Sequence, residues 1–576
     1  MRRAALAIVL CAAPLMAAPA QASTALAERQ ALREALRLEA GAAGSGALLA
    51  LPLPEGGAAA QAASSTSELR AIARRRGPQR VLVGLRAHSD LPGVAGVLRR
   101  LGAQPEAFRP MGVIAATAPS GAALARALGG DPRVAYVERD TELRIAQDPF
   151  DAPDPLQGGL KYTWWYDDVR AAEALAAAGG GSRRSVAVMD TGLDLTHPEF
   201  AGSGRIARTY DTHVGSQDVT DVVGHGTFVT GLIAAVDGNG VGGKGVAGNT
   251  QILAIRASSD GGFTERDLLR GIDFAMRRGG DVLNMSLAGD GIDQSVGRAL
   301  ATAFFNDVLP IAASGNKAQE GNPVQFPAAL LGGRNGRPGI GLSVAATRPN
   351  GSVAEFSTHN QFVSLAGPGA SAGDCRFGVF STLPSSLGTE WDRVDSCSLV
   401  VGSGGARYAY GEGTSFAAPI VSGIAALVWQ VERRLASEQV AEVMIRSARQ
   451  TQGTGWNEFT GAGIVDGAAA SALARTYDVT APRAKGSARR AGSSVRVRLR
   501  RVRDRTERGR ELAGDVTYGL LVSRDGGRSF TLVVSNRSRP FSRRVRLRGR
   551  RANVFMGTAC DGNGNCGLRR LGRFRR

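Results

Sequence analysis

The stretch "GTSFAAPIVSGIAAL", residues 413–427, is an apolar run of helical length that opens with Gly-Thr-Ser. Pro419 falls in its first turn, where proline is tolerated in a helix. A serine at the start of a helix is usually an N-cap, because its hydroxyl can accept a bond from a free backbone N–H. Ser415 is therefore either a cap or a residue held in place to react, and its surroundings must decide between the two.

Around this run, residues 155–475 alternate short apolar strands with helical segments. The β-rich runs end in small or polar residues, and they include "SVAVMD", "QILAIRA", "DVLNMSLAG" and "VLPIAASGN". This alternation predicts an α/β fold, in which a parallel sheet carries helices on both faces. Ligands of such sheets bind at the carboxyl ends of the strands, so we expect the functional residues there.

Three polar side chains fall at this side of the predicted sheet. Asp190 ends a strand, His225 opens a helix in "GHGTFVTGLIAA", and Ser415 opens the run quoted above. Acyl transfer by a serine needs a base that takes the hydroxyl proton and a carboxylate that fixes the tautomer of that base. Taken singly, the three are a turn residue, part of a tight turn and a helix cap. Together, in this order, they indicate a serine nucleophile with its base.

These segments resemble the subtilisin-like serine proteases over residues 155–475. Five motifs occur in the family's order: "DTGLDLTHPEF", "GHGTFVTGLIAA", "DVLNMSLAG", "AASGN" and "GTSFAAPIVSGIAAL". The chain order Asp, His, Ser is that of subtilisin. The resemblance implies a serine endopeptidase in which Asp190 orients His225, His225 acts as general base and then acid, and Ser415 is the nucleophile.

The same resemblance assigns an oxyanion donor. Asn316 in "AASGN" matches the family's oxyanion-hole asparagine, whose side-chain amide donates alongside the backbone N–H of Ser415. One such donor accounts for about 10²–10³ in turnover, a magnitude that comes from subtilisin itself. The structural alternative for Asn316 is a turn residue after Gly315.

Polypeptides are the expected substrates. The run Ser286, Leu287, Ala288 and Gly289 resembles the edge strand that pairs with the substrate main chain, and residues 258–263 resemble the opposite edge. Main-chain pairing accepts any extended peptide, so we expect broad specificity.

The primary pocket offers a narrower expectation. Lys317 follows the oxyanion asparagine at the pocket rim, and Gln325 lies near the pocket base. A cation at the rim predicts a preference for uncharged medium or large side chains before the scissile bond, with Glu better tolerated than Lys.

A structural calcium ion is a further expectation from the resemblance. The segment "AAVDGNGVGGKGVAG" matches the family's main calcium loop, with Asn239 as side-chain ligand and Glu199 in place of the usual carboxylate. Calcium prefers such oxygen donors. The alternative is a Gly-rich turn that binds no metal.

The N-terminal flank predicts export and a zymogen. Residues 1–22 have the charges, apolar stretch and Ala-Gln-Ala end of a signal peptide, so we expect a secreted protein. No later segment reaches 18 clean apolar residues, so we expect no membrane span. Residues 23–79 are an Ala/Gly-rich linker. Residues 80–146 alternate strands and helices and resemble the family's inhibitory α+β prodomain, whose self-cleavage we expect near residues 143–152.

The C-terminal flank is basic and β-rich. Residues 481–576 contain 27 Lys and Arg but 6 Asp and Glu, and their alternating runs predict a β-sandwich-like domain after a catalytic domain over 150–475. This charge indicates either a solvated surface or docking to an anionic surface or polymer. The chain could therefore also be a surface-binding protein that uses the protease fold as a scaffold.

Four cysteines follow the signal peptide, an even number that suggests disulfides in an exported chain. Three pairings are possible, and the local one is the simplest, because each pair lies within one segment. It joins Cys375 to Cys397 and Cys560 to Cys566. We expect the protein to be a monomer.

Overall fold

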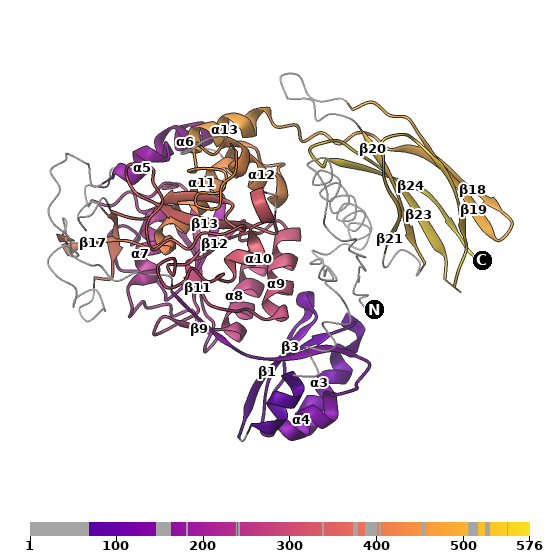
Figure 1. The fold of residues 1–576 in the computed structure, drawn as a ribbon, viewed down its shortest axis with the longest axis horizontal. Helices are drawn as coiled ribbons and strands as arrows, with labels where there is room; N and C mark the ends of the chain where they lie inside the picture. The colour runs from indigo at the N-terminus through magenta and orange to yellow at the C-terminus, as the bar shows by residue number, and fades with distance from the viewer. Residues whose placement is uncertain are drawn as a thin grey trace. The chain divides into compact units, whose positions relative to one another are not determined.

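The computed structural model describes two compact units, Asp140–Arg475 and the two flanks Met1–Arg139 and Thr476–Arg576 (Figure 1). Each unit is considered by itself. The described residues are 68–75, 77–145, 163–179, 183–237, 239, 242–336, 339–371, 378–385, 400–401, 405–450, 455–504, 516–524, 530–549 and 551–576.

The unit Asp140–Arg475, called the catalytic unit after the catalytic domain predicted within it, is built on a seven-stranded parallel sheet in the order β14-β13-β12-β10-β6-β8-β7, which confirms the predicted α/β fold. Its strands are β6 (Ser185–Asp190), β7 (Ile206–Asp211), β8 (Gln251–Arg256), β10 (Val282–Met285), β12 (Leu309–Ala313), β13 (Leu342–Thr347) and β14 (Leu365–Pro368). After β6, the chain forms β7 and β8 on one side of β6, and it then forms β10, β12, β13 and β14 on the other side. The order therefore reverses at β6, and a site is expected at its carboxyl end.

Helices cover both faces of this sheet. They are α5 (Trp164–Asp168), α6 (Ala171–Ala178), α7 (His225–Ala234), α8 (Glu265–Arg278), α9 (Gln294–Phe305), α10 (Ala328–Leu331), α11 (Thr414–Val431), α12 (Ser437–Ser447) and α13 (Gly467–Thr476). The most apolar, α11, packs on α7 and on β10, β12 and β13. In contrast, α8 buries one face, starts at a Thr264 side-chain cap and ends at Gly279 with φ +76°.

One described helix, α11, is long and apolar enough to cross a membrane by length and composition, which the sequence analysis did not anticipate. However, 94% of its 18-residue window is buried inside the protein. The same apolar pattern that would suit a bilayer here fills the core between helix and sheet.

The N-terminal module is an antiparallel sheet, β2-β3-β1-β4, with α3 (Leu91–Arg100) and α4 (Gly121–Leu128). Its strands are β1 (Gln79–Leu85), β2 (Glu106–Phe108), β3 (Val113–Ala118) and β4 (Val134–Arg139). Residues 68–74 are also helical, and Ile72 is fully buried with Val81 and Leu124, so this module includes residues before position 80.

The run "VAYVERDTELRI", residues 134–145, has the continuous β-rich pattern of one strand, but the structure divides it into two. β4 ends at Arg139 and pairs with β1, whereas β5 (Glu142–Ile145) pairs with two strands of the catalytic unit. The two halves have different partners, so the chain has to change sheets between them.

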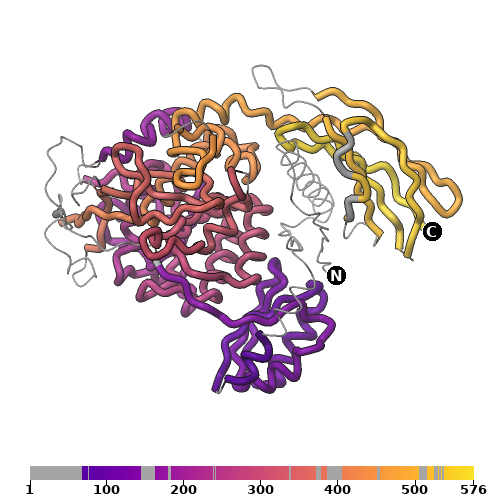
Figure 2. Tube along the Cα trace, viewed as in Figure 1, coloured from indigo at the N-terminus to yellow at the C-terminus, as the bar shows by residue number. Residues whose placement is uncertain are grey.

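The C-terminal module is the predicted β-sandwich, with a three-stranded sheet β18-β19-β22 and a four-stranded sheet β21-β20-β23-β24, drawn orange to yellow in Figure 2. Its strands are β18 (Lys485–Ala491), β19 (Ser494–Arg500), β20 (Thr517–Ser523), β21 (Thr531–Arg537), β22 (Ser542–Arg546), β23 (Asn553–Cys560) and β24 (Cys566–Phe574). Val495 and Val497 of β19 pack with Leu520 and Phe555 in its core. The predicted disulfide Cys560–Cys566 joins β23 to β24. Cys375 and Cys397 lie outside the described residues.

Candidate active site

Asp190 and His225 form a buried pair at the carboxyl end of β6. Oδ1 of Asp190 accepts hydrogen bonds from Nδ1 of His225 at 2.7 Å and from the Thr191 N–H at 2.8 Å. Asp190 is 1% exposed and His225 is fully buried. Since a carboxylate only accepts, Nδ1 carries the ring proton and Nε2 is the nitrogen that can accept one. In the described part of the chain, Nε2 has no hydrogen-bond partner.

The turn after β6 and the start of α7 are locked together by close backbone approach. A Cβ on Gly226 would lie 2.2 Å from the carbonyl oxygen of Gly192, so the residue after His225 must be glycine. Oγ1 of Thr191 accepts from the Gly226 N–H at 2.8 Å and donates to Asp221 at 2.9 Å. The two motifs that carry the acid and the base are thereby held at fixed separation.

Asp221 is a positioning residue that the sequence analysis missed. It is 1% exposed, and its carboxylate also accepts from the Gly224 N–H at 2.8 Å and from both donors of Thr227 at 2.8 and 2.7 Å. These bonds fix the first turn of α7, on which His225 lies. An aspartate three residues before "GHG" could have been noticed, but nothing in its local pattern distinguishes it from a surface turn residue.

Ser415 is the second residue of α11 and is fully buried. The N-cap position belongs to Gly413, and the helix has no side-chain cap, so the cap interpretation of Ser415 is wrong. Oγ of Ser415 donates to the Ser286 carbonyl at 3.0 Å, and the Ser286 hydroxyl donates back to the Ser415 carbonyl at 2.7 Å.

Phe416, the residue after Ser415, lies near the base: its ring centroid is 5.6 Å from that of His225. The bond between Oγ of Ser415 and Nε2 of His225 is not formed in this arrangement, because the hydroxyl is turned toward Ser286. Catalytic hydrogen bonds often form only with substrate present, so this geometry is compatible with a resting enzyme.

Thr414 fixes the side chain of Asn316. Oδ1 of Asn316 accepts from the Thr414 N–H at 3.0 Å and from its hydroxyl at 2.7 Å, and the same hydroxyl accepts from the Gly315 N–H at 3.1 Å. With its oxygen held, the amide presents Nδ2 on the opposite side as a donor. The Ser415 N–H lies in the first turn of α11, whose N–H groups have no partner within the helix.

Residues 142–145 occupy the two edges that the sequence predicts to bind a peptide. β5 lies between β11 (Leu287–Ala288) and β9 (Gly262–Thr264), antiparallel to both. Ile145 is opposite Leu287, and Arg144 is opposite Ala288. Gly289 instead exchanges two 2.9 Å backbone bonds with Phe326. A segment of the chain itself therefore lies where an extended substrate would pair.

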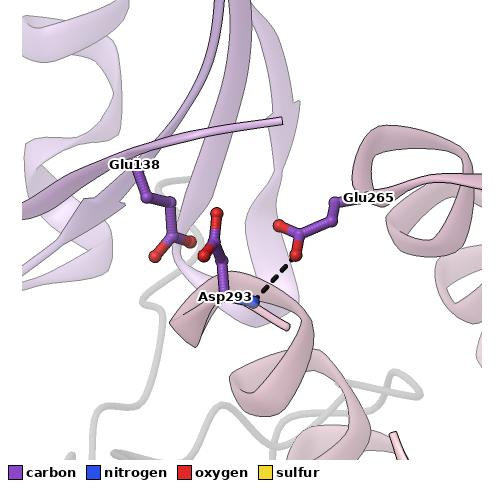
Figure 3. A group of neighbouring side chains, drawn as sticks. All are labelled: Glu138, Glu265 and Asp293. Carbon is purple, nitrogen blue, oxygen red and sulfur yellow. Dashed lines mark hydrogen bonds between the residues drawn. The ribbon is translucent and has the colours of Figure 1, made fainter. Parts of the chain in front are cut away.

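The strand β5 is anchored at its start by a buried glutamate. Glu265 opens α8, and its Oε1 accepts from the Thr141 hydroxyl at 2.9 Å and from the Asp293 N–H at 2.8 Å, a bond drawn in Figure 3. The Glu265 N–H donates to the Thr141 carbonyl at 3.0 Å. This anchor was also missed, because its partners lie more than 100 residues apart in the chain.

Lys317 and Gln325 are joined by Asp290. Nζ of Lys317 lies 3.1 Å from Oδ1 of Asp290, and Nε2 of the buried Gln325 donates to the same oxygen at 2.7 Å. The Gln325 amide and then the Lys317 ammonium hold the pKa of Asp290 below its usual value. The cation at the rim is thus paired with a carboxylate, which removes the electrostatic reason for expecting Glu to be tolerated better than Lys.

Glu199 and Asn239 do not fit a calcium site in this arrangement. Glu199 is fully buried, and its carboxylate accepts from the Val236 N–H at 3.0 Å, from Nδ2 of Asn239 at 2.8 Å, from the Gly243 N–H and from the Tyr408 hydroxyl at 2.6 Å. Burial and then the Glu199 carboxylate raise the pKa of Tyr408, so its hydroxyl remains a donor. Each oxygen of Glu199 accepts two hydrogen bonds, so its four lone-pair sites are filled by donors and none is left for a cation. Residues 238, 240 and 241 of this loop lie outside the described residues.

A buried imidazole held by a carboxylate, next to a serine at a helix start, is the arrangement of a serine hydrolase. The parallel sheet and the chain order Asp, His, Ser narrow this class to the subtilisin-like enzymes. The chain belongs to the Subtilase family, whose profile matches residues 181–463.

Similar proteins include a thermophilic serine proteinase of Bacillus sp. (strain AK1), 31% identical over 56% of this chain and 70% of that one, and alkaline elastase YaB of Bacillus sp. (strain YaB), 30% identical over 60% and 76%. Fervidolysin of Fervidobacterium pennivorans is 30% identical over 52% of this chain and 42% of its own length. Its crystal structure, described as that of a keratinolytic enzyme related to subtilisin, aligns with a TM-score of 0.58 at 18% identity, covering 87% of this chain and 92% of that one. At this identity the structural match shows the fold alone.

Proposed function

We propose that the protein is a secreted serine endopeptidase that cleaves peptide bonds through an acyl-enzyme on Ser415. The observation that carries the proposal is the 2.7 Å bond from Nδ1 of His225 to the buried Asp190, which leaves Nε2 as the nitrogen that can accept a proton. The His225 ring lies 5.6 Å from that of Phe416, the residue after Ser415. Secretion is supported by the signal pattern of residues 1–22.

In this mechanism the Ser415 hydroxyl leaves the Ser286 carbonyl and gives its proton to Nε2 of His225 while Oγ attacks the substrate carbonyl carbon. The oxyanion accepts bonds from Nδ2 of Asn316 and from the Ser415 N–H. His225 then protonates the leaving amine as the C–N bond breaks. Water attacks the ester with His225 as base, and the acid product leaves with Ser415 restored.

A fluorophosphonate probe tests the nucleophile directly. It should label the matured wild type at Ser415, as located by peptide mass spectrometry. Ser415→Ala should lose the label, whereas Ser447→Ala, a serine at the end of α12, should keep it. Labelling that survives Ser415→Ala would rule out this serine, and a folded, matured wild type that takes no label would favour the scaffold alternative.

We further propose that residues 80–146 are an inhibitory prodomain that the enzyme removes from itself. The support is the position of β5, which pairs with both substrate-binding edges as a bound product would. Ile145, the last residue of β5, is opposite Leu287, which directly follows Ser286 in the chain. Ser286 is the residue whose carbonyl holds the nucleophilic hydroxyl. We therefore expect the bond after Ala146 to be cut.

Attack within one chain needs no second enzyme, because the effective concentration of the bond is high. The purified wild type should begin at Gln147, and Ser415→Ala should remain a single precursor that begins near Ser23. N-terminal sequencing and intact mass measure both. If Ser415→Ala produced in a protease-free system matures as the wild type does, the self-cleavage is excluded.

Arginines on one face of the basic C-terminal module support a proposal about a binding partner. Alternate residues of β19 are buried and exposed, and the exposed ones include Arg496. Arg496 is directly opposite Arg489 of β18 and Arg544 of β22, both exposed. Like charges directly opposite each other destabilise a sheet. We infer that this row of arginines binds an anionic polymer, which would neutralise it.

A further inference from the structure

Three aspartates meet at the turn that joins β23 to β24 in the C-terminal module. Asp561 lies in that turn, Asp478 precedes β18 and Asp504 follows β19. One carboxylate oxygen of each lies within 4.8 Å of one from each of the others. Asp478 is fully buried and Asp561 is 2% exposed. Three acidic groups so close and so shielded from water repel one another unless positive charge lies among them.

The fully buried Asp478 has an oxygen that nothing satisfies. Its Oδ1 accepts from the Thr480 N–H at 3.0 Å, whereas its Oδ2 has no hydrogen-bond partner among the described residues. Among the described residues, neither Asp478 nor Asp561 forms an ion pair with a Lys or Arg, although residues 481–576 contain 27 Lys and Arg residues. An unpaired buried carboxylate is strongly unfavourable, so this oxygen points to a missing positive ligand.

The turn that carries Asp561 is held rigidly against the segment of Asp478. The disulfide Cys560–Cys566 closes the turn. Asn565 donates from its N–H to Oδ1 of Asp561 at 2.9 Å and from Nδ2 to Oδ2 at 2.8 Å. Nδ2 of Asn565 also donates to the Asp478 carbonyl at 2.7 Å. Asn565 therefore holds the carboxylate of Asp561 against the backbone of Asp478.

Burial, to which the nearby carboxylates of Asp504 and Asp478 add, raises the pKa of Asp561 to about 8. Without a cation, the group would have to hold a proton to remain buried near neutral pH. Proton sharing among the three side chains is thus the competing explanation of the cluster, and the experiment must separate it from metal binding.

We propose that Asp478, Asp504 and Asp561 bind one calcium ion. All three offer hard oxygen donors, and the two cysteines nearby are joined in a disulfide, so the donor set suits calcium rather than zinc. The ion would tie the turn between β23 and β24 to the segment that enters the module at Asp478. This proposal concerns the stability of the C-terminal module and does not depend on proteolysis.

Calcium binding can be measured on the full-length Ser415→Ala chain, which cannot digest itself by the proposed mechanism, after removal of metal with a chelating resin. Titration calorimetry should show one site that takes calcium in preference to magnesium, and added calcium should raise the melting temperature. Asp561→Asn keeps the size of the side chain and removes its charge, so it should weaken calcium binding at least tenfold. Glu458→Gln, an exposed acidic residue elsewhere, should bind calcium as the parent does.

A difference that appears only with calcium identifies a metal site. Without calcium at neutral pH, Asp561→Asn should melt close to the parent, because Asp561 of the parent then holds a proton and is uncharged; with millimolar calcium, the parent should melt higher. If Asp561→Asn does not fold, Asp504→Asn, which is partly exposed, takes its place. No binding at millimolar calcium would leave proton sharing as the explanation. Binding that survives both substitutions but is lost in Asn239→Ala would place the ion in the catalytic unit. Either result overturns the proposal.

Discussion

At the scale of single residues, neutral hydroxyls position the nucleophile and the proposed oxyanion donor, whereas carboxylates position the base. Thr414 holds the oxygen of the Asn316 amide, and Ser286 exchanges bonds with Ser415. Each such bond contributes only about 0.5–1.5 kcal/mol to stability. Their larger effect is on geometry, since an amide that turned around would present oxygen rather than N–H to the oxyanion.

Asp290 sets the charge of the primary pocket in our interpretation. Asp290→Asn removes the carboxylate that pairs with Lys317, so the ammonium should become available to an acidic substrate side chain. The pair is largely exposed to solvent, and exposed pairs are worth about 0.2–1 kcal/mol, so we expect the ratio of kcat/KM for Glu over Lys substrates to rise about two- to fivefold.

Matched peptides that differ only in the residue before the scissile bond measure this ratio. Lys317→Gln together with Asp290→Asn is the control, and it should return the ratio toward that of the wild type. A ratio unchanged by Asp290→Asn alone would mean that Lys317 does not face the substrate.

The residues of the site differ in how well they could be predicted from the sequence. Asp190, His225 and Ser415 each lie at the end of an element, and parallel strands bring such ends together, so local motifs were sufficient to predict them. Glu199 was predicted to be a metal ligand because its motif does not show the Tyr408 hydroxyl, which donates a hydrogen bond to it from 209 residues away. Lys317 was predicted to be an unpaired cation because Asp290, with which it forms an ion pair, lies 27 residues earlier and outside the motif. Partners so distant cannot be seen in a motif.

At the scale of elements, the same distinction holds. Apolar periodicity predicted the strands of the parallel sheet and the helices α3 and α4, since these bury residues at a fixed repeat. The break between β4 and β5 was not predicted, because 134–145 is one continuous β-rich run and only the choice of partner strands divides it. β18 was missed as well: its sequence KGSARRA has no β-branched or aromatic residue, and pairing with β19 alone makes it a strand.

The arginine row across β18, β19 and β22 provides a prediction at this scale. Changing Arg489, Arg496 and Arg544 together to Gln should weaken binding to heparin, used as a probe polyanion, and should flatten the dependence of binding on salt. The same variant should be as stable as the parent or more stable, because the repulsion across the strands is relieved.

Heparin-column elution and fluorescence titration at several salt concentrations measure this binding in the Ser415→Ala background. Arg126→Gln, Arg277→Gln and Arg446→Gln together form a control of equal charge change, at helix positions in the other two modules. Equal loss of binding in both triple variants would show that net charge alone attracts the polyanion and that no specific face exists.

At the scale of the whole molecule, the match to the family and the excess of positive charge lie in different parts of the chain. The family profile covers residues 181–463, whereas the excess of basic residues lies within 481–576. The catalytic unit therefore has to be stable by burial rather than by charge, and α11 shows how: a helix apolar enough for a bilayer is instead enclosed by the protein.

The catalytic unit also contains a buried group that should limit its stability in alkali. Burial, followed by the charges of Asp237 and Asp167, raises the pKa of Tyr166 to about 12. Tyr166 is 3% exposed. Between pH 10 and 12 the unfolded chain loses this phenolic proton while the folded protein keeps it. Unfolding is then favoured by up to about 2 kcal/mol at pH 12, and the full stability is present below pH 10.

Tyr166→Phe removes the proton from both states and keeps the ring that packs under Lys244. The variant should therefore match the wild type within about 1 kcal/mol at pH 7, and its stability should fall less steeply between pH 10 and 12. Urea unfolding of the Ser415→Ala chain, followed by tryptophan fluorescence at fixed steps of pH, measures both slopes. Parallel slopes for the two proteins would show that Tyr166 ionises in the folded state as readily as in the unfolded one. The alkaline loss of stability would then have to be assigned to other groups of the unit, of which Tyr408, bonded to Glu199, is the next to test.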